Sequence, residues 1–83
     1  VLFRSYFSIE VEDKPGAAAK VTSQFAKHQV GIDELIQKES KKNCTARLII
    51  ITDSAEEKII NKLQINLKNL SLTSDVRFIR IEN

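Results

Sequence analysis

The chain has 83 residues, which is enough for one small domain with a single core and too few for two. Its 13 basic and 11 acidic residues are interspersed and leave a net charge of +2, without the basic stripe that is typical of nucleic-acid binders. No run approaches the roughly 20 apolar residues of a membrane-spanning helix. We therefore expect neither nucleic acid nor membrane as a partner, and the composition is that of an ordinary globular domain.

The first residue and the cysteine content give two further expectations. The chain begins with Val1, and its apolar start is too short for a signal peptide, which predicts a fragment of a longer chain. We expect one domain over 1–83 with a core over about 5–82. Cys44 is the only cysteine, which excludes an internal disulfide and a CxxC metal site and favours a reducing, cytoplasmic setting. The expected role of Cys44 is that of a small core residue.

The first two elements follow from a change of period along the chain. Residues 6–12 alternate, with Phe7, Ile9 and Val11 on one side, and predict a strand with one buried face. From residue 17 to about 28, apolar positions recur at helical spacing. This pattern predicts an amphipathic helix of about three turns.

Two more strands are predicted next. The first covers 30–38, with a bulge at 35–36 where the alternation slips. Residues 41–43 are expected to turn the chain, and 44–52 to form the third strand. The run 48–51 is apolar on both faces, so this strand is expected to be central or covered by another copy.

The last two elements are a helix and a strand. Ser54 and Glu57 fit a capping box, in which each side chain bonds the backbone N–H of the other residue. The helix that follows has a buried stripe, flanked by Ile59, that consists of Ile60, Leu63, Leu67 and Leu70. The final strand, over 76–82, is expected to place Ile79 and Ile81 on one side and Phe78 and Arg80 on the other.

The order strand, helix, strand, strand, helix, strand predicts an α+β fold. Two strand–helix–strand units with right-handed crossovers interleave into a ferredoxin-like βαββαβ sandwich. We expect a four-stranded antiparallel sheet with the first and third strands central and both helices on one face. This fold hosts several unrelated functions, so the site residues must distinguish them.

Three functions of this fold lack their residues here. An RNA-recognition module stacks bases on aromatic residues of its first and third strands, and only Tyr6 is available for that role. A soft-metal carrier needs a cysteine pair near the first loop, so no metal site is expected. An acyl-phosphate hydrolase needs an arginine and a glycine-rich phosphate loop at the first turn. This chain has Lys14, Pro15 and Gly16 there, followed by alanines.

No group of residues points to catalysis. His28 is the only histidine and lies near the end of the first helix, where a hydrogen-bond donor or cation suits the negative end of the helix dipole. The acidic pairs Glu10/Glu12 and Glu56/Glu57 fit the exposed side of a strand and the start of a helix. We therefore expect no catalytic residue in this domain.

The joint 13–16, between the first strand and the first helix, is the strongest candidate for a binding site. A residue before proline stays extended, proline suits the first helical turn, and Gly16 permits close approach of a backbone or ligand. The N–H groups from Gly16 to Ala18 would point out of a positive helix terminus, which accepts a carboxylate or phosphate. The alternative is that Asp13 caps the helix and nothing else binds, and the tetrapeptide alone favours it.

The wider pattern resembles a known family. The segment VEDKPGAAAKVTSQFAKHQVGIDELIQKES, the run ARLIIIT and the terminal FIRIEN resemble an ACT domain, a regulatory module that senses amino acids. The resemblance runs from Tyr6 to Glu82 and is closest to the domain that ends bacterial homoserine dehydrogenases. It implies paired domains, with an effector between the first loop of one copy and the start of the second strand of the other. The positions that this resemblance assigns to effector binding are Val11, Asp13, Pro15, Gly16, Ala17, Val30, Gly31 and Ile32.

The resemblance also implies a parent enzyme and leaves an alternative open. The parent would be an NAD(P)-dependent homoserine dehydrogenase with threonine as its feedback effector, and this domain itself would hold no cofactor. Two departures from the family pattern are Ala17, where a large aliphatic residue is common, and Gly31, where asparagine is frequent. Loss of a polar contact to a charged ligand group costs about 1.5–3 kcal/mol. A ligand-free structural dimerisation module of ACT type is therefore the alternative function.

Overall fold

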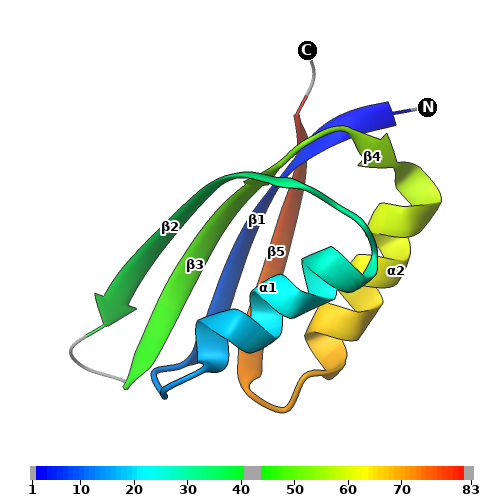
Figure 1. The fold of residues 1–83 in the computed structure, drawn as a ribbon. Coiled ribbons are helices and arrows are strands. Elements are labelled where there is room, and N and C mark those ends of the chain that lie inside the picture. Colours follow the sequence, from blue (N-terminus) through cyan, green and yellow to red (C-terminus); the bar gives the residue numbers. More distant parts are fainter. Residues whose placement is uncertain (1, 41–43, 82–83) are drawn as a thin grey trace.

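One antiparallel sheet with two helices on one face makes up the computed structural model, which describes residues 2–40 and 44–81 (Figure 1). The elements in chain order are β1 (Leu2–Glu12), α1 (Ala17–Lys27), β2 (Ile32–Ser40), β3 (Thr45–Thr52), β4 (Ala55–Glu56), α2 (Glu57–Asn69) and β5 (Thr73–Ile81). β3 pairs with both β1 and β2, and β5 pairs with β1. The predicted ferredoxin-like α+β fold is confirmed, with β1 and β3 inside the sheet and β2 and β5 as its outer strands.

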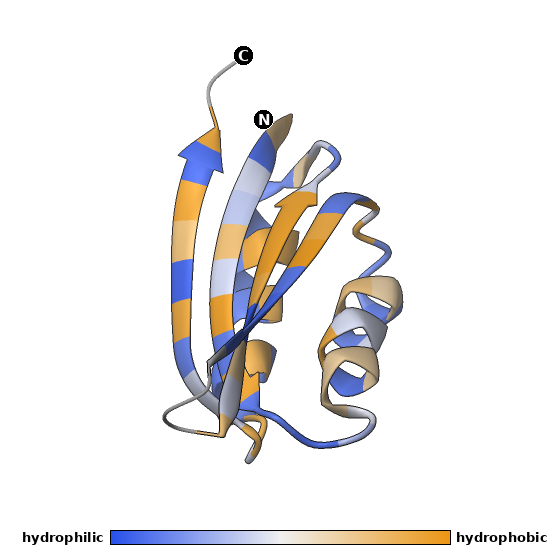
Figure 2. Ribbon diagram, turned by 90° about the vertical axis from the view of Figure 1, so that its left-hand side faces the viewer, coloured by the Kyte–Doolittle hydropathy of each residue, from blue (hydrophilic) through white to orange (hydrophobic). Residues whose placement is uncertain are grey.

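Side chains that stand opposite each other across the sheet show which face the helices cover. Phe7 of β1 is opposite Ile50 of β3 and Phe78 of β5. Phe7 and Ile50 are fully buried, and the rings of Phe7 and of Phe25 in α1 form a T-shaped pair with a centroid distance of 5.3 Å. The predicted buried side of β1 is therefore confirmed. Along β5, Figure 2 shows apolar and polar residues as successive bands of opposite hydropathy.

The other face of the sheet has no helix and is called the open face below. It carries the even-numbered residues of β1, the odd-numbered residues of β3 and, from Asp75 on, the odd-numbered residues of β5, because these stand opposite one another in the two registers. On β5, Ile79 lies on the open face and is 61% exposed. Arg80 lies on the helix face, where its guanidinium carbon is 4.4 Å from the centre of the Phe3 ring. The predicted division of the last strand into two sides is confirmed.

The predicted capping box before α2 is wrong. Ala55 and Glu56 are extended and form β4, which pairs with Phe3 and Leu2 of β1. The helix begins only at Glu57, with no side-chain hydrogen bond to its first turn. Pairing with β1 has taken the residues that the box would need for the helix start. The buried stripe of α2 is confirmed at three of its four positions, Ile60, Leu63 and Leu67, while Leu70 follows the helix and is half-buried.

Two expectations around the β2–β3 hairpin also change. Cys44 is exposed, not part of the core, because it has the left-handed φ of 51° of a turn residue directly before β3. The register shift of β2 falls between Ile32 and Glu34, nearer the start of the strand than predicted. The predicted turn at 41–43 lies outside the described residues. Within the described chain, neither α1 nor α2 is long and apolar enough to cross a membrane.

Candidate functional site

The joint between β1 and α1 is an open turn with no side-chain cap. Gly16 precedes the helix with a left-handed φ of 83°, a conformation that favours glycine. A Cβ at Gly16 would meet nothing within 4 Å, so backbone conformation, not close approach, requires the glycine. Asp13 is exposed and does not cap α1, so the capping interpretation is wrong. Its backbone N–H donates to the Cys44 carbonyl at 2.9 Å, which ties the joint to the β2–β3 hairpin.

The start of α1 offers three backbone donors. The Ala17 N–H was expected to be free, but it donates to the Lys14 carbonyl at 3.1 Å. The N–H groups of Gly16, Ala18 and Ala19 have no backbone acceptor among the described residues. Helical bonding starts when Lys20 donates to the Gly16 carbonyl at 3.0 Å. The positive end of the α1 dipole therefore retains three donors for an anion.

A cavity of about 320 Å³ lies beside this joint. The residues of the predicted loop half that line it are Val11, Asp13, Pro15, Gly16 and Ala17. Three further lining residues come from β2 and β3 and were not predicted: Gln37, Ala46 and Leu48. Gln37 stands opposite the buried Leu48, so it lies on the helix face of β2, at the outer strand. The structure thus gathers the whole loop half of the predicted site around one cavity.

The other predicted half lies at the opposite end of β2. Val30, Gly31 and Ile32 do not line the cavity. Gln37 is about 16 Å farther along the strand than Ile32, at the usual strand rise. Val30 is only 4% exposed and belongs to the core, and Ile32 is half-buried. Within one chain, the two predicted halves are therefore separate.

Asp53 stands over Gly31 and was missed by sequence reasoning. Its backbone N–H donates to the Gly31 carbonyl at 2.9 Å. A Cβ placed on Gly31 would overlap the Asp53 Oδ2 atom and lie 3.3 Å from its Cγ. The space of a side chain at position 31 is therefore filled by a carboxylate from the end of β3. No local pattern in the sequence links these two positions, because they meet only across the β2–β3 pair.

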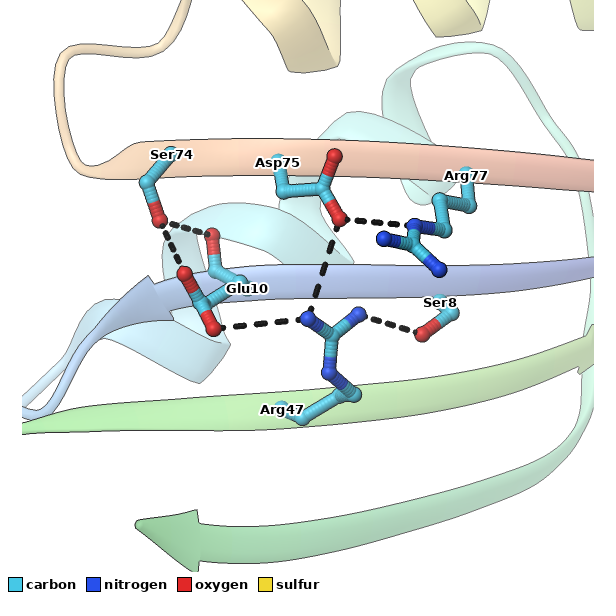
Figure 3. Close-up of polar contacts among 6 residues, drawn as sticks. All are labelled: Ser8, Glu10, Arg47, Ser74, Asp75 and Arg77. Atoms are coloured by element: carbon cyan, nitrogen blue, oxygen red, sulfur yellow. Dashed lines mark hydrogen bonds and ion pairs between the residues drawn. The ribbon is translucent and has the colours of Figure 1, made fainter. Parts of the chain in front are cut away.

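The polar residues of the open face form their own network (Figure 3). Arg47 of β3 donates to the Ser8 hydroxyl at 2.7 Å and to the Glu10 carboxylate at 3.3 Å. The same Glu10 carboxylate accepts from Ser74 at 2.9 Å, and Asp75 pairs with Arg47 at 3.7 Å. Glu10 is thus engaged in strand-to-strand contacts, as its structural interpretation predicted. No group of three or more metal-ligating side chains occurs within residues 2–40 and 44–81.

His28 connects the two helices. Its Nδ1 lies 2.8 Å from the Gln24 carbonyl, and because a carbonyl only accepts, Nδ1 carries the proton. Its Nε2 lies 3.0 Å from the Asn66 side-chain nitrogen of α2 and accepts a hydrogen bond from it. The predicted role of His28 as a donor at the end of α1 is confirmed.

Comparison with known families agrees with this geometry. The family model described as "ACT domain" matches residues 5–71, and the chain belongs to the ACT domain family. The homoserine dehydrogenase of Mycobacterium tuberculosis is 32% identical over 84 residues, which cover 95% of this chain and 19% of that enzyme. The chain spans about a fifth of the length of the curated relatives it matches.

Solved structures give the same picture. The crystal structure of a homoserine dehydrogenase from Thiobacillus denitrificans matches with a TM-score of 0.86 and 26% identity, over 100% of this chain and 18% of that one. The small subunit of acetolactate synthase from Thermotoga maritima matches with a TM-score of 0.76 and 26% identity, over 89% of this chain and 45% of that one. The regulatory ACT fold is thus shared with parts of larger metabolic proteins.

Proposed function

We propose that this chain is the C-terminal regulatory domain of a homoserine dehydrogenase and binds an amino-acid effector between two paired copies. Threonine is the first candidate for this effector. The observation that carries the proposal is the cavity at the β1–α1 joint, which all five residues of the predicted loop half line. Effector binding there would shift the conformational populations of the catalytic part. The parent enzyme would be an NAD(P)-dependent, cytoplasmic oxidoreductase, and this domain itself would hold no cofactor.

Charge and donor placement support an amino acid as the ligand. An α-amino acid has a carboxylate and an ammonium group bonded to the same α-carbon. The free N–H groups of Gly16 and Ala18, at the positive end of α1, suit the carboxylate. The exposed Asp13 adds a negative group beside the same cavity, which is suited to an ammonium or hydroxyl group of the effector.

The shape of the sheet supports pairing along β2. β2 is an outer strand, and its backbone edge away from β3 is unpaired among the described residues. When two such strands pair antiparallel about a twofold axis, the start of one lies beside the end of the other. This arrangement would bring Gly31 of one copy to the cavity of the second. The two halves that are apart in one chain would then form one site.

A structural dimerisation module is the second candidate. Leu35 and Ile36 on β2 are 45% and 47% exposed, an apolar pair on an outer strand that pairing would cover whether or not a ligand binds. In this alternative the missing side chain at Gly31 would reflect the loss of the effector site. The cavity at the joint would then remain empty.

Calorimetric titration of the purified chain with threonine and a small panel of amino acids separates the two candidates. The regulatory proposal expects saturable heat for one or a few amino acids. Asp13→Asn should weaken that binding by about tenfold or more, the cost of one hydrogen bond to a charged group. Glu56→Gln, which removes a charge far from the cavity, is the control. Absence of heat with every amino acid up to millimolar concentration would favour the structural module.

A further inference from the structure

The carboxylate of Asp53 occupies the space that a side chain at position 31 would take. Gly31 has no side chain, and a Cβ built there would overlap Asp53 Oδ2. The backbone holds this arrangement in place, since the Asp53 N–H donates to the Gly31 carbonyl at 2.9 Å. Asp53 is therefore fixed at the start of β2 by the same hydrogen bond that joins the two segments.

Asp53 differs from the neighbouring acidic residue in having no partner. The Asp33 carboxylate receives a hydrogen bond from Arg4 at 2.7 Å and is neutralised by it. The Asp53 carboxylate makes no hydrogen bond or ion pair with any described residue, and the residue is exposed. A carboxylate that is positioned by its backbone but unpaired is available to a cation from outside the chain.

The position of Asp53 complements the cavity at the other end of β2. The cavity end presents backbone N–H groups and a helix N-terminus, which suit an anion. The Asp53 end presents a negative charge, which suits a cation. Antiparallel pairing of two β2 strands would place these two ends beside each other, once on each side of the twofold axis.

We propose that Asp53 of one copy binds the ammonium group of the effector whose carboxylate is bound at the β1–α1 joint of the other copy. Asp53 would thereby replace the side chain that Gly31 lacks, and it would restrict the ligand to small acids with a protonated α-amino group. This inference rests on the proposed regulatory function and on pairing along β2. It explains how a site without a side chain at position 31 retains a polar partner for the ligand.

The test compares two ligands that differ only in the group that Asp53 would bind. The probes are threonine and 2,3-dihydroxybutanoate, in which a hydroxyl replaces the ammonium group. The wild-type chain should bind threonine more tightly than the hydroxy acid. Asp53→Asn should weaken threonine binding about ten- to hundredfold, the loss of one charge-assisted hydrogen bond, and leave the affinity for the hydroxy acid nearly unchanged.

Two controls separate a lost ligand contact from a structural effect. Glu56→Gln removes one exposed carboxylate close in sequence and should change neither affinity. Asp53→Ala should repeat the result of Asp53→Asn, and the melting temperature of both variants should stay near that of the wild-type chain, since the backbone bond to Gly31 is retained.

The outcomes distinguish this inference from the proposed function on which it rests. If the wild-type chain binds threonine but Asp53→Asn binds it equally well, the role of Asp53 is overturned and the regulatory function stands. If the wild-type chain binds no amino acid, both the function and the role of Asp53 are overturned. Equal loss of both ligands in Asp53→Asn would also refute ammonium recognition, because the hydroxy acid has no ammonium group.

Discussion

The two ends of β2 differ in every property that matters for binding a small zwitterion. At the end near Gln37 lies a cavity with backbone donors, a positive helix terminus and a left-handed glycine. At the end near Gly31, Val30 is buried, Ile32 packs against the core, and the Asp53 carboxylate stands at the surface without a partner among the described residues. The carboxylate at the Gly31 end suits only the ammonium group of an amino acid, whereas the cavity end has donors for the carboxylate and also the exposed Asp13. On the proposed pairing, one chain would carry one half of each of two sites, and the two outer strands together would complete them.

Breaking the pairing should have the largest effect. Leu35 stands opposite the buried Ile50, so it lies on the helix face of β2 and not on the open face. Leu35→Lys would place a charge at a pairing strand edge in both copies, where like charges repel. We expect the variant to be a monomer by light scattering at concentrations where the wild-type chain is a dimer, and to lose effector binding with it.

Ile79→Lys is the matched control for that experiment. Ile79 is also an exposed apolar residue, but it lies on the open face of β5, the other outer strand. Pairing along β2 expects this variant to remain a dimer. A dimer that survives Leu35→Lys and dissociates with Ile79→Lys would instead show that two copies stack through their open faces, and the two ends of β2 would not meet.

Restoring the side chain at position 31 sharpens the comparison next. Gly31→Asn forces the Asp53 carboxylate aside, because the new Cβ overlaps Oδ2, although that end of the aspartate can rotate. We expect the single variant to bind threonine several-fold to about tenfold more weakly, within the range of one polar contact. Combined with Asp53→Ala, the asparagine gains the vacated space, and calorimetry should show part of the affinity regained. A double variant weaker than both single variants would contradict the exchange of roles.

Sequence periodicity was sufficient to predict the fold but not its exceptions. Alternation in β1 and the apolar stripe of α2 predicted two layers, because burial of one face determines both patterns. The capping box at Ser54 failed because long-range pairing of β4 with β1 outweighed a local helix signal. The core role of Cys44 failed because residue type does not reveal a left-handed turn.

The candidate site divides in the same way. The loop half, from Val11 to Ala17, is contiguous in sequence and was found from the proline, the glycine and the family resemblance. Gln37 and Asp53 were missed as site residues because each reaches its position through the register of β2 on β3. A single sequence does not specify that register residue by residue, so contacts between distant strands escaped prediction.

Gly16, which has a left-handed φ at the cavity end of β2, gives the third prediction. Gly16→Ala should destabilise the chain by about 1–2 kcal/mol, the cost of a left-handed L-residue, since its Cβ meets no other atom. For a domain of this size the melting temperature should fall by roughly 4–8 °C per kcal/mol. Gly16→Asn is the control and should lose less, because asparagine tolerates this conformation better. Equal losses for the two variants would point to a steric cause in place of a backbone one.

The left-handed residue at the Asp53 end gives the smallest expected effect, with the opposite sign. Gln29 has a φ of 57° directly after α1, in a C-terminal motif where its N–H donates to the Ala26 carbonyl at 3.0 Å and that of Val30 to the Phe25 carbonyl at 2.9 Å. Glycine is the usual residue at this position.

Gln29→Gly should therefore stabilise the chain by about 0.5–1 kcal/mol, because relief of the left-handed strain outweighs the greater freedom of glycine in the unfolded state. Thermal or denaturant unfolding measures the change. Gln24→Gly makes the same exchange of residues inside α1, where φ is helical, and should destabilise by about 1 kcal/mol. Because the hydrogen bonds of the motif come from the backbone, they persist in Gln29→Gly, and effector affinity should not change. A loss of affinity in Gln29→Gly would mean that the position of Gly31 and Asp53 depends on strain at the end of α1. The two ends of β2 would then depend on each other more closely than the contacts in one chain imply.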